Sequence, residues 1–116
     1  MTATNRAITA DACLRALDAE FFKALCEPSR LEVIRAMIKL GPADVGDIAG
    51  QTPQDRSVVS RHLQVLQRQG LAISHKEGRH MIYQLDGPAI LEKLCCAVAA
   101  VEALVPLCCP GTEATE

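Results

Sequence analysis

Cysteine thiols are the side chains of this 116-residue sequence that are best suited to chemistry. There are six of them: the adjacent pairs Cys95-Cys96 and Cys108-Cys109, and the single residues Cys13 and Cys26. Thiolates bind soft metal ions and undergo reversible oxidation. Each single cysteine can equally well be a small apolar side chain buried in the core. That interpretation is a poor one for two adjacent pairs. Because disulfides are rare in a reducing compartment, the pairs indicate soft-metal ligation or redox chemistry.

A second group of polar side chains shares one side of a predicted helix between residues 57 and 69. Apolar residues recur at helical spacing on its inner side, at Val59, Leu63 and Leu66. Its outer side carries Ser57, Ser60, Arg61 and Gln64. Hydroxyl, amide and guanidinium groups bind phosphate oxygens and base edges when a helix lies in the major groove of DNA. For this segment alone, a solvated amphipathic helix is the alternative interpretation.

The elements around this helix are typical of a helix-turn-helix with a β-hairpin. Thr52 is a candidate cap, so the helix is expected to begin near Pro53 or Asp55, and Gly70 is expected to end it. Alternating residues predict strands over 71–76 and 80–85, which Glu77-Gly78-Arg79 joins in a hairpin with a basic tip. Residues 44–50 form a short helix before the polar one. The predicted fold class is mainly α with one hairpin.

The remaining segments are predicted helices that provide the scaffold. A first helix is expected from Asp11 to Cys26, with Leu14, Leu17, Phe21 and Leu25 on one face, and Glu27-Pro28 ends it. A second runs from Leu31 to Leu40, with core positions Val33, Ile34, Met37 and Ile38. The last helix, from Pro88 to about Val105, is apolar nearly all round. In a domain of this size, a second copy of the chain is the simplest cover, which predicts a homodimer.

Composition and charge narrow the class of partner. Apolar residues make up 49% of the chain and aromatic residues only 3%, which argues against a single-strand binder that stacks bases on rings. The formal net charge is −2, but residues 54–80 hold five basic and two acidic side chains. No segment is apolar enough to span a bilayer, and the N-terminus lacks the layout of a secretory signal. We therefore expect a cytoplasmic protein with no membrane partner.

A thiol enzyme is the competing class of function. Such an enzyme needs a cysteine of low pKa at a helix N-terminus or in a C-x-x-C motif, and the sequence has neither. It also has no glycine-rich phosphate loop and no paired acid and base. We expect no enzymatic activity and no catalytic residue.

Four motifs carry a resemblance to a known family: LCEPSRLEVIRAMI, DIAGQ, SVVSRHLQVLQRQGL and KEGRHMIYQL. Through them the chain resembles the ArsR/SmtB family of metal-responsive and metalloid-responsive repressors, over roughly residues 10 to 105. The resemblance implies a winged helix-turn-helix in a dimer, whose first and last helices pack together. Two recognition helices would then address successive major grooves of an inverted repeat. Residues 1–9 are expected to be flexible, and residues 106–116 to form a cysteine-containing tail.

The motif match and the local charge assign candidate DNA contacts. Arg56, Ser57, Ser60, Arg61 and Gln64 are expected to face the major groove. Arg79, at the tip of the hairpin, is expected to approach the adjacent minor groove or its phosphates. His62 has two equal interpretations, a phosphate contact or a side chain packed beneath the helix.

The resemblance also narrows the choice of effector, because metal ligands of other family members are missing from this sequence. The last helix lacks the histidine ligands of the family's zinc and nickel sensors, and the Cys-x-Cys site of other members is reduced to Cys26. What remains resembles members whose arsenite-type site lies near the C-terminus, around a vicinal cysteine pair. Trivalent arsenic or antimony on three thiolates fits best, and cadmium, lead or mercury also accept such ligands. The rival within this family is a redox or persulfide sensor.

The candidate metal ligands are the two cysteine pairs. Cys96 and Cys108 would stand about 18 Å apart in one straight helix, which is too far to share an ion. Pro106 is expected to end or bend that helix. We expect Cys95 and Cys96 to bind with a third thiolate from Cys108 or Cys109, most easily that of the other subunit. Cys13 is the reserve third ligand.

Overall fold

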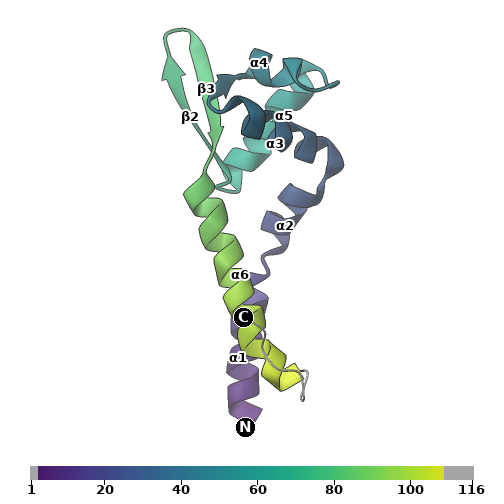
Figure 1. Cartoon of the computed structure of the whole chain (residues 1–116), viewed down its shortest axis with the longest axis vertical. Coiled ribbons are helices and arrows are strands. Elements are labelled where there is room, and N and C mark those ends of the chain that lie inside the picture. Colours follow the sequence, from purple (N-terminus) through teal and green to yellow (C-terminus); the bar gives the residue numbers. More distant parts are fainter. Residues whose placement is uncertain (1–2, 109–116) are drawn as a thin grey trace. The chain divides into compact units, whose positions relative to one another are not determined.

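The computed structural model describes residues 3–108, which form helices and three short strands (Figure 1). In chain order the elements are α1 (Ala3–Ala16), α2 (Ala19–Cys26), α3 (Pro28–Leu40), β1 (Ala43–Asp44), α4 (Val45–Gly50), α5 (Arg56–Arg68), β2 (Ala72–Glu77), β3 (His80–Leu85) and α6 (Gly87–Cys108). The chain divides into two compact units. The central unit is Ala19–Ile90, and the terminal unit joins the residues up to Asp18 with those from Leu91 onward. Among residues 3–108, no helix is both long and apolar enough to cross a membrane.

The core of the central unit forms around the inner side of α5. Val59, Leu63 and Leu66 are each 0% exposed, and they belong to the same buried cluster as Val33 of α3 and Ile48 of α4. A helix with one apolar stripe must bury that stripe against other elements, and here the stripe and its partners are fully covered. The predicted helix-turn-helix of α4 and α5 is therefore confirmed.

The predicted hairpin is also confirmed, and it belongs to a small antiparallel sheet. The strand order is β1-β3-β2, with Ala72 opposite Leu85 and Glu77 opposite His80. Gly78 and Arg79 connect β2 and β3, and Gly78 has a φ of +61°, which glycine adopts readily at the first position of a two-residue turn. The two-residue strand β1 was not predicted. Such a short segment has no alternation of its own, and it becomes a strand only through its pairing with β3.

The junctions of the central unit are held by specific hydrogen bonds. Glu27 precedes Pro28 with extended backbone, and its carboxylate accepts hydrogen bonds from the backbone N–H groups of Ser29 and Arg30, at 3.2 and 2.8 Å. At the end of α5, Gly70 has a φ of +74° and the N–H of Leu71 donates to the carbonyl of Leu66 at 2.8 Å. This is the Schellman arrangement that the sequence predicted from Gly70.

Several helix boundaries differ from the sequence prediction, among them the start of α3, which is Pro28 and not Leu31. The predicted helix 11–26 is two helices, α1 and α2, which are separated by Leu17 and Asp18. Leu14 and Phe21, predicted to lie on one face of a single helix, lie in different helices: Leu14 is 69% exposed and Phe21 is buried. Residues 3–9, expected to be flexible, lie in α1. At the other end, α6 continues through Pro106 to Cys108 instead of ending near Val105.

Two further expectations within the central unit can be compared with the structure. The recognition helix begins at Arg56 with Asp55 at its N-cap, so of the two expected starts the one near Asp55 is confirmed and the one near Pro53 is wrong. Thr52 instead serves the preceding turn, because its hydroxyl donates to the carbonyl of Ala49 and accepts from the N–H of Gln54. Ile38, predicted to lie in the core, is 68% exposed, whereas Val33, Ile34 and Met37 are buried as predicted.

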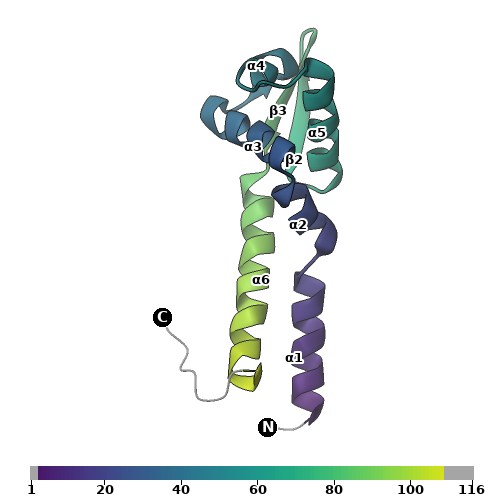
Figure 2. The ribbon, with the colours of Figure 1, turned by 90° about the vertical axis from the view of Figure 1, so that its right-hand side faces the viewer.

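The terminal unit is an antiparallel pair of helices, α1 and the greater part of α6 (Figure 2). Arg6 donates to the carbonyl of Leu107 at 2.8 Å, and at the opposite end Lys93 lies 3.7 Å from the carboxylate of Asp18. Cys13 and Ala97 are buried in this unit. Many other apolar side chains of the pair are exposed, among them Ile8, Leu14, Leu91, Leu94, Val98 and Val101.

Candidate nucleic-acid interface and thiol groups

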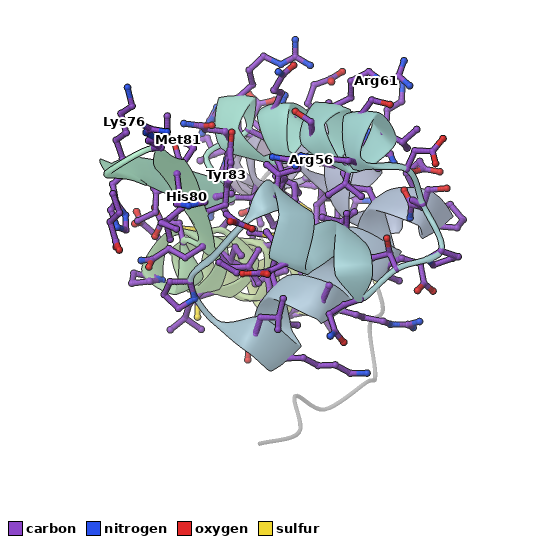
Figure 3. The ribbon with its side chains drawn as sticks, turned by 90° about the horizontal axis from the view of Figure 1, so that it is seen from above. Arg56, Arg61, Lys76, His80, Met81 and Tyr83 are labelled. Atoms are coloured by element: carbon purple, nitrogen blue, oxygen red, sulfur yellow. The ribbon has the colours of Figure 1, made fainter. Side chains whose placement is uncertain are left out.

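The outer side of α5 presents most of the predicted DNA contacts to solvent. Arg56, Ser57, Arg61 and Gln64 are exposed, and Ser60 is half-buried. Figure 3 shows Arg61 extending from α5 away from the protein. Ser57, Arg61 and Gln64 are exposed on the side of α5 opposite the core, whereas the guanidinium of Arg56 lies close to Gly46 and Asp44 at the start of α4. A helix that is held in this way is suited to enter a major groove.

The hairpin adds two cations beside this helix. Arg79 is exposed in the turn, and Lys76 is exposed near the end of β2, where it extends away from the protein (Figure 3). Lys76 was not among the predicted site residues. Lys76 lies near the turn of a hairpin whose outward positions are polar. This position in the sequence could have identified it as a candidate DNA contact. The hairpin can thus offer two positive charges to phosphate oxygens.

A contact between side chains connects the hairpin to the start of α4. His80 Nδ1 lies 3.1 Å from Oδ2 of Asp44, and the other oxygen of Asp44 accepts a hydrogen bond from the N–H of Asp47 at 2.8 Å. That hydrogen bond is the main reason that the pKa of Asp44 is lowered, with further contributions from His80 and Arg56. Asp44 therefore remains ionised and joins the hairpin to the helix-turn-helix.

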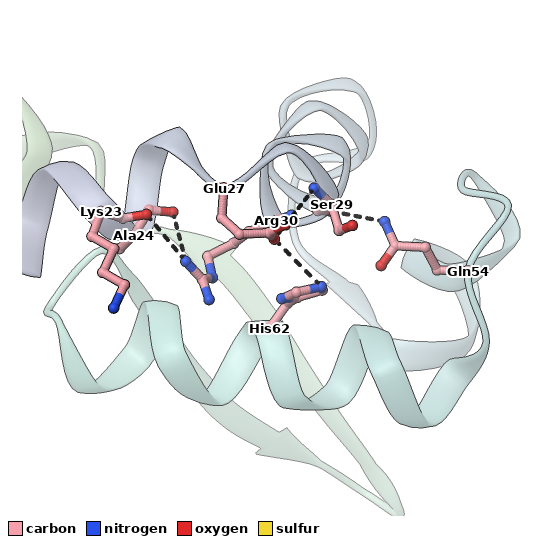
Figure 4. A network of polar contacts seen from close by, with 7 residues as sticks. All are labelled: Lys23, Ala24, Glu27, Ser29, Arg30, Gln54 and His62. Atoms are coloured by element: carbon pink, nitrogen blue, oxygen red, sulfur yellow. Dashed lines mark hydrogen bonds and ion pairs between the residues drawn. The ribbon is translucent and has the colours of Figure 1, made fainter.

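His62, in contrast to the other predicted DNA residues of α5, points toward the inside of the central unit. Its side chain is only 14% exposed, and Nε2 lies 4.0 Å from Oε2 of Glu27 (Figure 4). Burial, followed by the positive charge of Arg30, lowers the pKa of His62. Nε2 is buried without a hydrogen-bond partner in the described part of the chain. Of the two interpretations, the structure has the packed one, with a neutral imidazole beneath the helix.

The surroundings of His62 form a polar network between α2, α3 and α5 (Figure 4). Arg30 donates through one guanidinium nitrogen to the carbonyls of Lys23 and Ala24, both at 3.3 Å. Gln54 donates to the carbonyl of Ser29 at 2.7 Å. The pKa of Glu27 is lowered, chiefly by the hydrogen bond from the N–H of Arg30. The bond between Gln54 and Ser29 and the approach of His62 to Glu27 are not predicted from the sequence, because each joins residues of different segments.

The thiols fall in three different settings. Cys95 and Cys96 are exposed on α6, Cys13 is buried in the same terminal unit, and Cys26 is exposed at the end of α2. All four are free. The side chain of Cys108 and the whole of Cys109 lie outside the described residues. Within the described part, no three His, Cys, Asp or Glu side chains are grouped to hold a metal ion.

Comparison with known proteins identifies relatives with the same architecture. A family model described as bacterial regulatory protein, arsR family, matches residues 27–74. An uncharacterised HTH-type transcriptional regulator of Mycobacterium tuberculosis, Rv0081, is 33% identical over 70% of this chain and 71% of its own length. The arsenical resistance operon repressor of Escherichia coli is 31% identical over 60% of each chain.

Solved structures agree with these relatives. The crystal structure of Rv0081 has a TM-score of 0.58 and 30% identity, covering 79% of this chain and 92% of the other. A homodimeric winged helix-turn-helix domain from Mycobacterium bovis has a TM-score of 0.59 and 26% identity, covering 90% and 94%. The helix-turn-helix and hairpin of the central unit are thus of a kind found in transcriptional regulators.

The buried, neutral state of His62 predicts a loss of stability in acid. Its pKa in the folded protein is below the ordinary value of 6.5, so the unfolded chain takes up the proton first and folding stability falls as the pH drops below about 6.5. The His62→Gln variant has no imidazole at this position, so this loss of stability in acid is absent. Thermal unfolding at pH 7.5 and 5.5, at one protein concentration, should show a larger fall in Tm for the wild type than for the variant. Equal falls in both proteins would contradict a buried, neutral His62.

Proposed function

This chain belongs to the ArsR family of bacterial transcriptional regulators, and we propose that it is a homodimeric repressor whose thiols release it from DNA. The effector is trivalent arsenic or antimony, coordinated by cysteine thiolates. The observation that carries this proposal is the exposed vicinal pair Cys95-Cys96 on α6, in a chain whose central unit has a DNA-reading helix. A relative named as an arsenical resistance operon repressor supports the choice of metalloid.

A second copy of the chain is the proposed cover for the terminal unit. Leu91, Leu94, Val98 and Val101 of α6 are all at least 39% exposed, together with Ile8 and Leu14 of α1. Apolar area buried between two copies stabilises association by roughly 25 cal/mol per Å² before the costs of binding are subtracted. The structural neighbour described as homodimeric supports this assembly. A twofold dimer would present two copies of α5 to the two halves of an inverted repeat.

The proposed DNA contacts come from α5 and the hairpin. Arg56, Ser57, Ser60, Arg61 and Gln64 address base edges and phosphates in the major groove. Arg79, with Lys76 beside it, contacts the phosphates or the minor groove next to it. His62 takes no direct part, since it lies beneath the helix. The chain carries a formal net charge of −2, so nonspecific binding should be modest and much of the affinity must come from a defined operator.

Cys95 and Cys96 supply two of the three thiolates in the proposed effector site. Free thiols are the donor type that soft ions select, so the residues fit the proposed effector. Since α6 continues to Cys108, that residue lies about 18 Å along the same helix from Cys96, which is beyond a shared ion. This distance supports a third thiolate from Cys108 or Cys109 of the other subunit.

Cys13 is the alternative source of the third thiolate. The two ends of the helix pair are tied by the Arg6–Leu107 and Lys93–Asp18 contacts, so α1 and α6 run antiparallel with a known offset. Counted from these two contacts, Cys13 lies at the level of residues 98 to 100, about one helical turn beyond the vicinal pair. A site of this kind would lie within one chain.

The DNA-binding assignment predicts different effects for two arginines. Arg79→Ala should weaken binding to all duplexes and lower the slope of log affinity against log salt by about one. Arg61→Ala should also relax the choice of sequence if it contacts a base. Arg35→Ala is a matched control, because that exposed arginine of α3 is paired with Glu32 at 3.5 Å. If the Arg61→Ala/Arg79→Ala protein kept wild-type operator affinity at moderate salt, the assignment would be wrong.

The source of the third thiolate can be determined with mixed dimers and arsenite titration. A homodimer of Cys108→Ser/Cys109→Ser chains should lose high-affinity arsenite binding. A heterodimer of that chain with a Cys95→Ser/Cys96→Ser chain should keep one complete site. Cys26→Ser, which removes an exposed thiol of the central unit, is the control and should keep both sites.

Two results of the arsenite titration would contradict the arrangement between subunits. Two intact sites in the Cys108→Ser/Cys109→Ser homodimer would assign the third thiolate to Cys13. No site in the heterodimer would place the complete set of thiolates within one chain.

A further inference from the structure

The first turn of α5 has no side-chain cap of its own. Asp55 occupies the N-cap position with extended backbone, yet its side chain makes no capping hydrogen bond. Arg56 and Ser57, two of the proposed DNA contacts, stand on this first turn. Contacts of other residues must therefore hold this end of α5 in position.

Gln54 ties the residues before α5 to the start of α3. Its side-chain amide donates to the carbonyl of Ser29 at 2.7 Å, across a sequence separation of 25 residues. Its backbone N–H donates to the hydroxyl of Thr52, which in turn donates to the carbonyl of Ala49 at the end of α4. Gln54 is therefore the point at which the turn between α4 and α5 is joined to α3.

His62 contacts the same region from the middle of α5. It points away from the outer side that carries Arg61, and its Nε2 lies 4.0 Å from the carboxylate of Glu27 (Figure 4). That carboxylate cannot move freely, because it caps α3 through the N–H groups of Ser29 and Arg30. Gln54, two residues before α5, and His62, in the middle of α5, thus both lie against one short segment of the chain.

This segment is the elbow between α2 and α3, which we define as Glu27, Ser29 and Arg30. Arg30 completes it by donating to the carbonyls of Lys23 and Ala24 in the last turn of α2. The elbow thereby joins three helices through the carboxylate of Glu27, the guanidinium of Arg30 and the carbonyl of Ser29. Its contacts with α5 all lie on the side opposite the proposed DNA face.

We propose that the elbow sets the position of the recognition helix, and that Gln54 and His62 are positioning residues for operator binding that touch no DNA. The inference rests on the proposed DNA-binding function. A reading helix must hold its side chains within a fraction of an ångström of the groove contacts, so looseness beneath it lowers affinity. Substituting a positioning residue should therefore change operator affinity without changing the number of phosphates that the protein contacts.

The experiment compares Gln54→Ala and His62→Gln with two other variants on a duplex selected from random-sequence DNA by the wild-type protein. Gln54→Ala should weaken operator binding roughly three- to tenfold, with the salt slope unchanged. Arg61→Ala, on the outer side, should lower that slope by about one. Gln51→Ala, an exposed glutamine just past α4, is the matched control and should bind as the wild type does.

Amide hydrogen exchange of the free proteins gives a readout that needs no DNA. In Gln54→Ala, the amides of residues 59–64 should exchange faster than in the wild type and in Gln51→Ala, because α5 is held at one point fewer. His62→Ala should do the same, and His62→Gln should restore slower exchange, since its amide can replace the polar contact with Glu27.

The inference is overturned by either of two results. A fall of about one in the salt slope of Gln54→Ala or His62→Gln would make that residue a phosphate contact. Unchanged exchange in both Gln54→Ala and His62→Ala would show that the elbow does not hold α5. If the wild type enriched no sequence, the DNA-binding proposal would fail, and the exchange data would still decide whether the elbow positions the helix.

Discussion

Burial of one side of α5 is the constraint on which the rest of the central unit depends. Val59, Leu63 and Leu66 are fully buried, and each such side chain stabilises the fold by about 1.5–3 kcal/mol. Turning the helix by one residue, about 100°, would expose part of this stripe and bury charged groups. The outer side is therefore determined by the inner one, and Arg56, Ser57, Arg61 and Gln64 face solvent because the core allows no other orientation. The Glu27 cap, the Schellman turn at Gly70 and the His80–Asp44 pair hold the neighbouring elements around that helix.

The terminal unit differs from the central one, because it exposes many apolar side chains of the kind that a folded domain normally buries. Its apolar side chains and its thiols lie on the same two helices, so the surface proposed to meet a second copy and the groups proposed to bind the effector share one structural element. Coupling between effector and operator then requires only that occupied thiols favour a different arrangement of the dimer from the one that fits DNA. The two proposed functions are thus assigned to different units, and α6 contributes residues to both units.

Local sequence patterns predicted the parts of this fold that depend on local physics. The apolar stripe of α5, the glycine that ends it and the alternating strands of the hairpin are all read from neighbours within a few positions. The predictions that failed concern features that residues nearby in the sequence do not determine. The break before α2 falls within a continuous helical pattern, and the strand β1 exists only through pairing with β3. The orientation of His62 and the Gln54–Ser29 bond depend on contacts more than 20 residues apart, as does any site that combines thiols of two chains.

Operator affinity measured with and without arsenite is the most direct test of the link between the thiols and DNA. Fluorescence anisotropy of a labelled operator duplex, under reducing conditions, follows the complex as arsenite is added. If thiolate coordination releases the repressor, arsenite should weaken wild-type binding by about tenfold or more and leave the Cys95→Ser/Cys96→Ser protein bound. Wild-type affinity that stays unchanged, or an equal loss in both proteins, would contradict control of DNA binding by these cysteines.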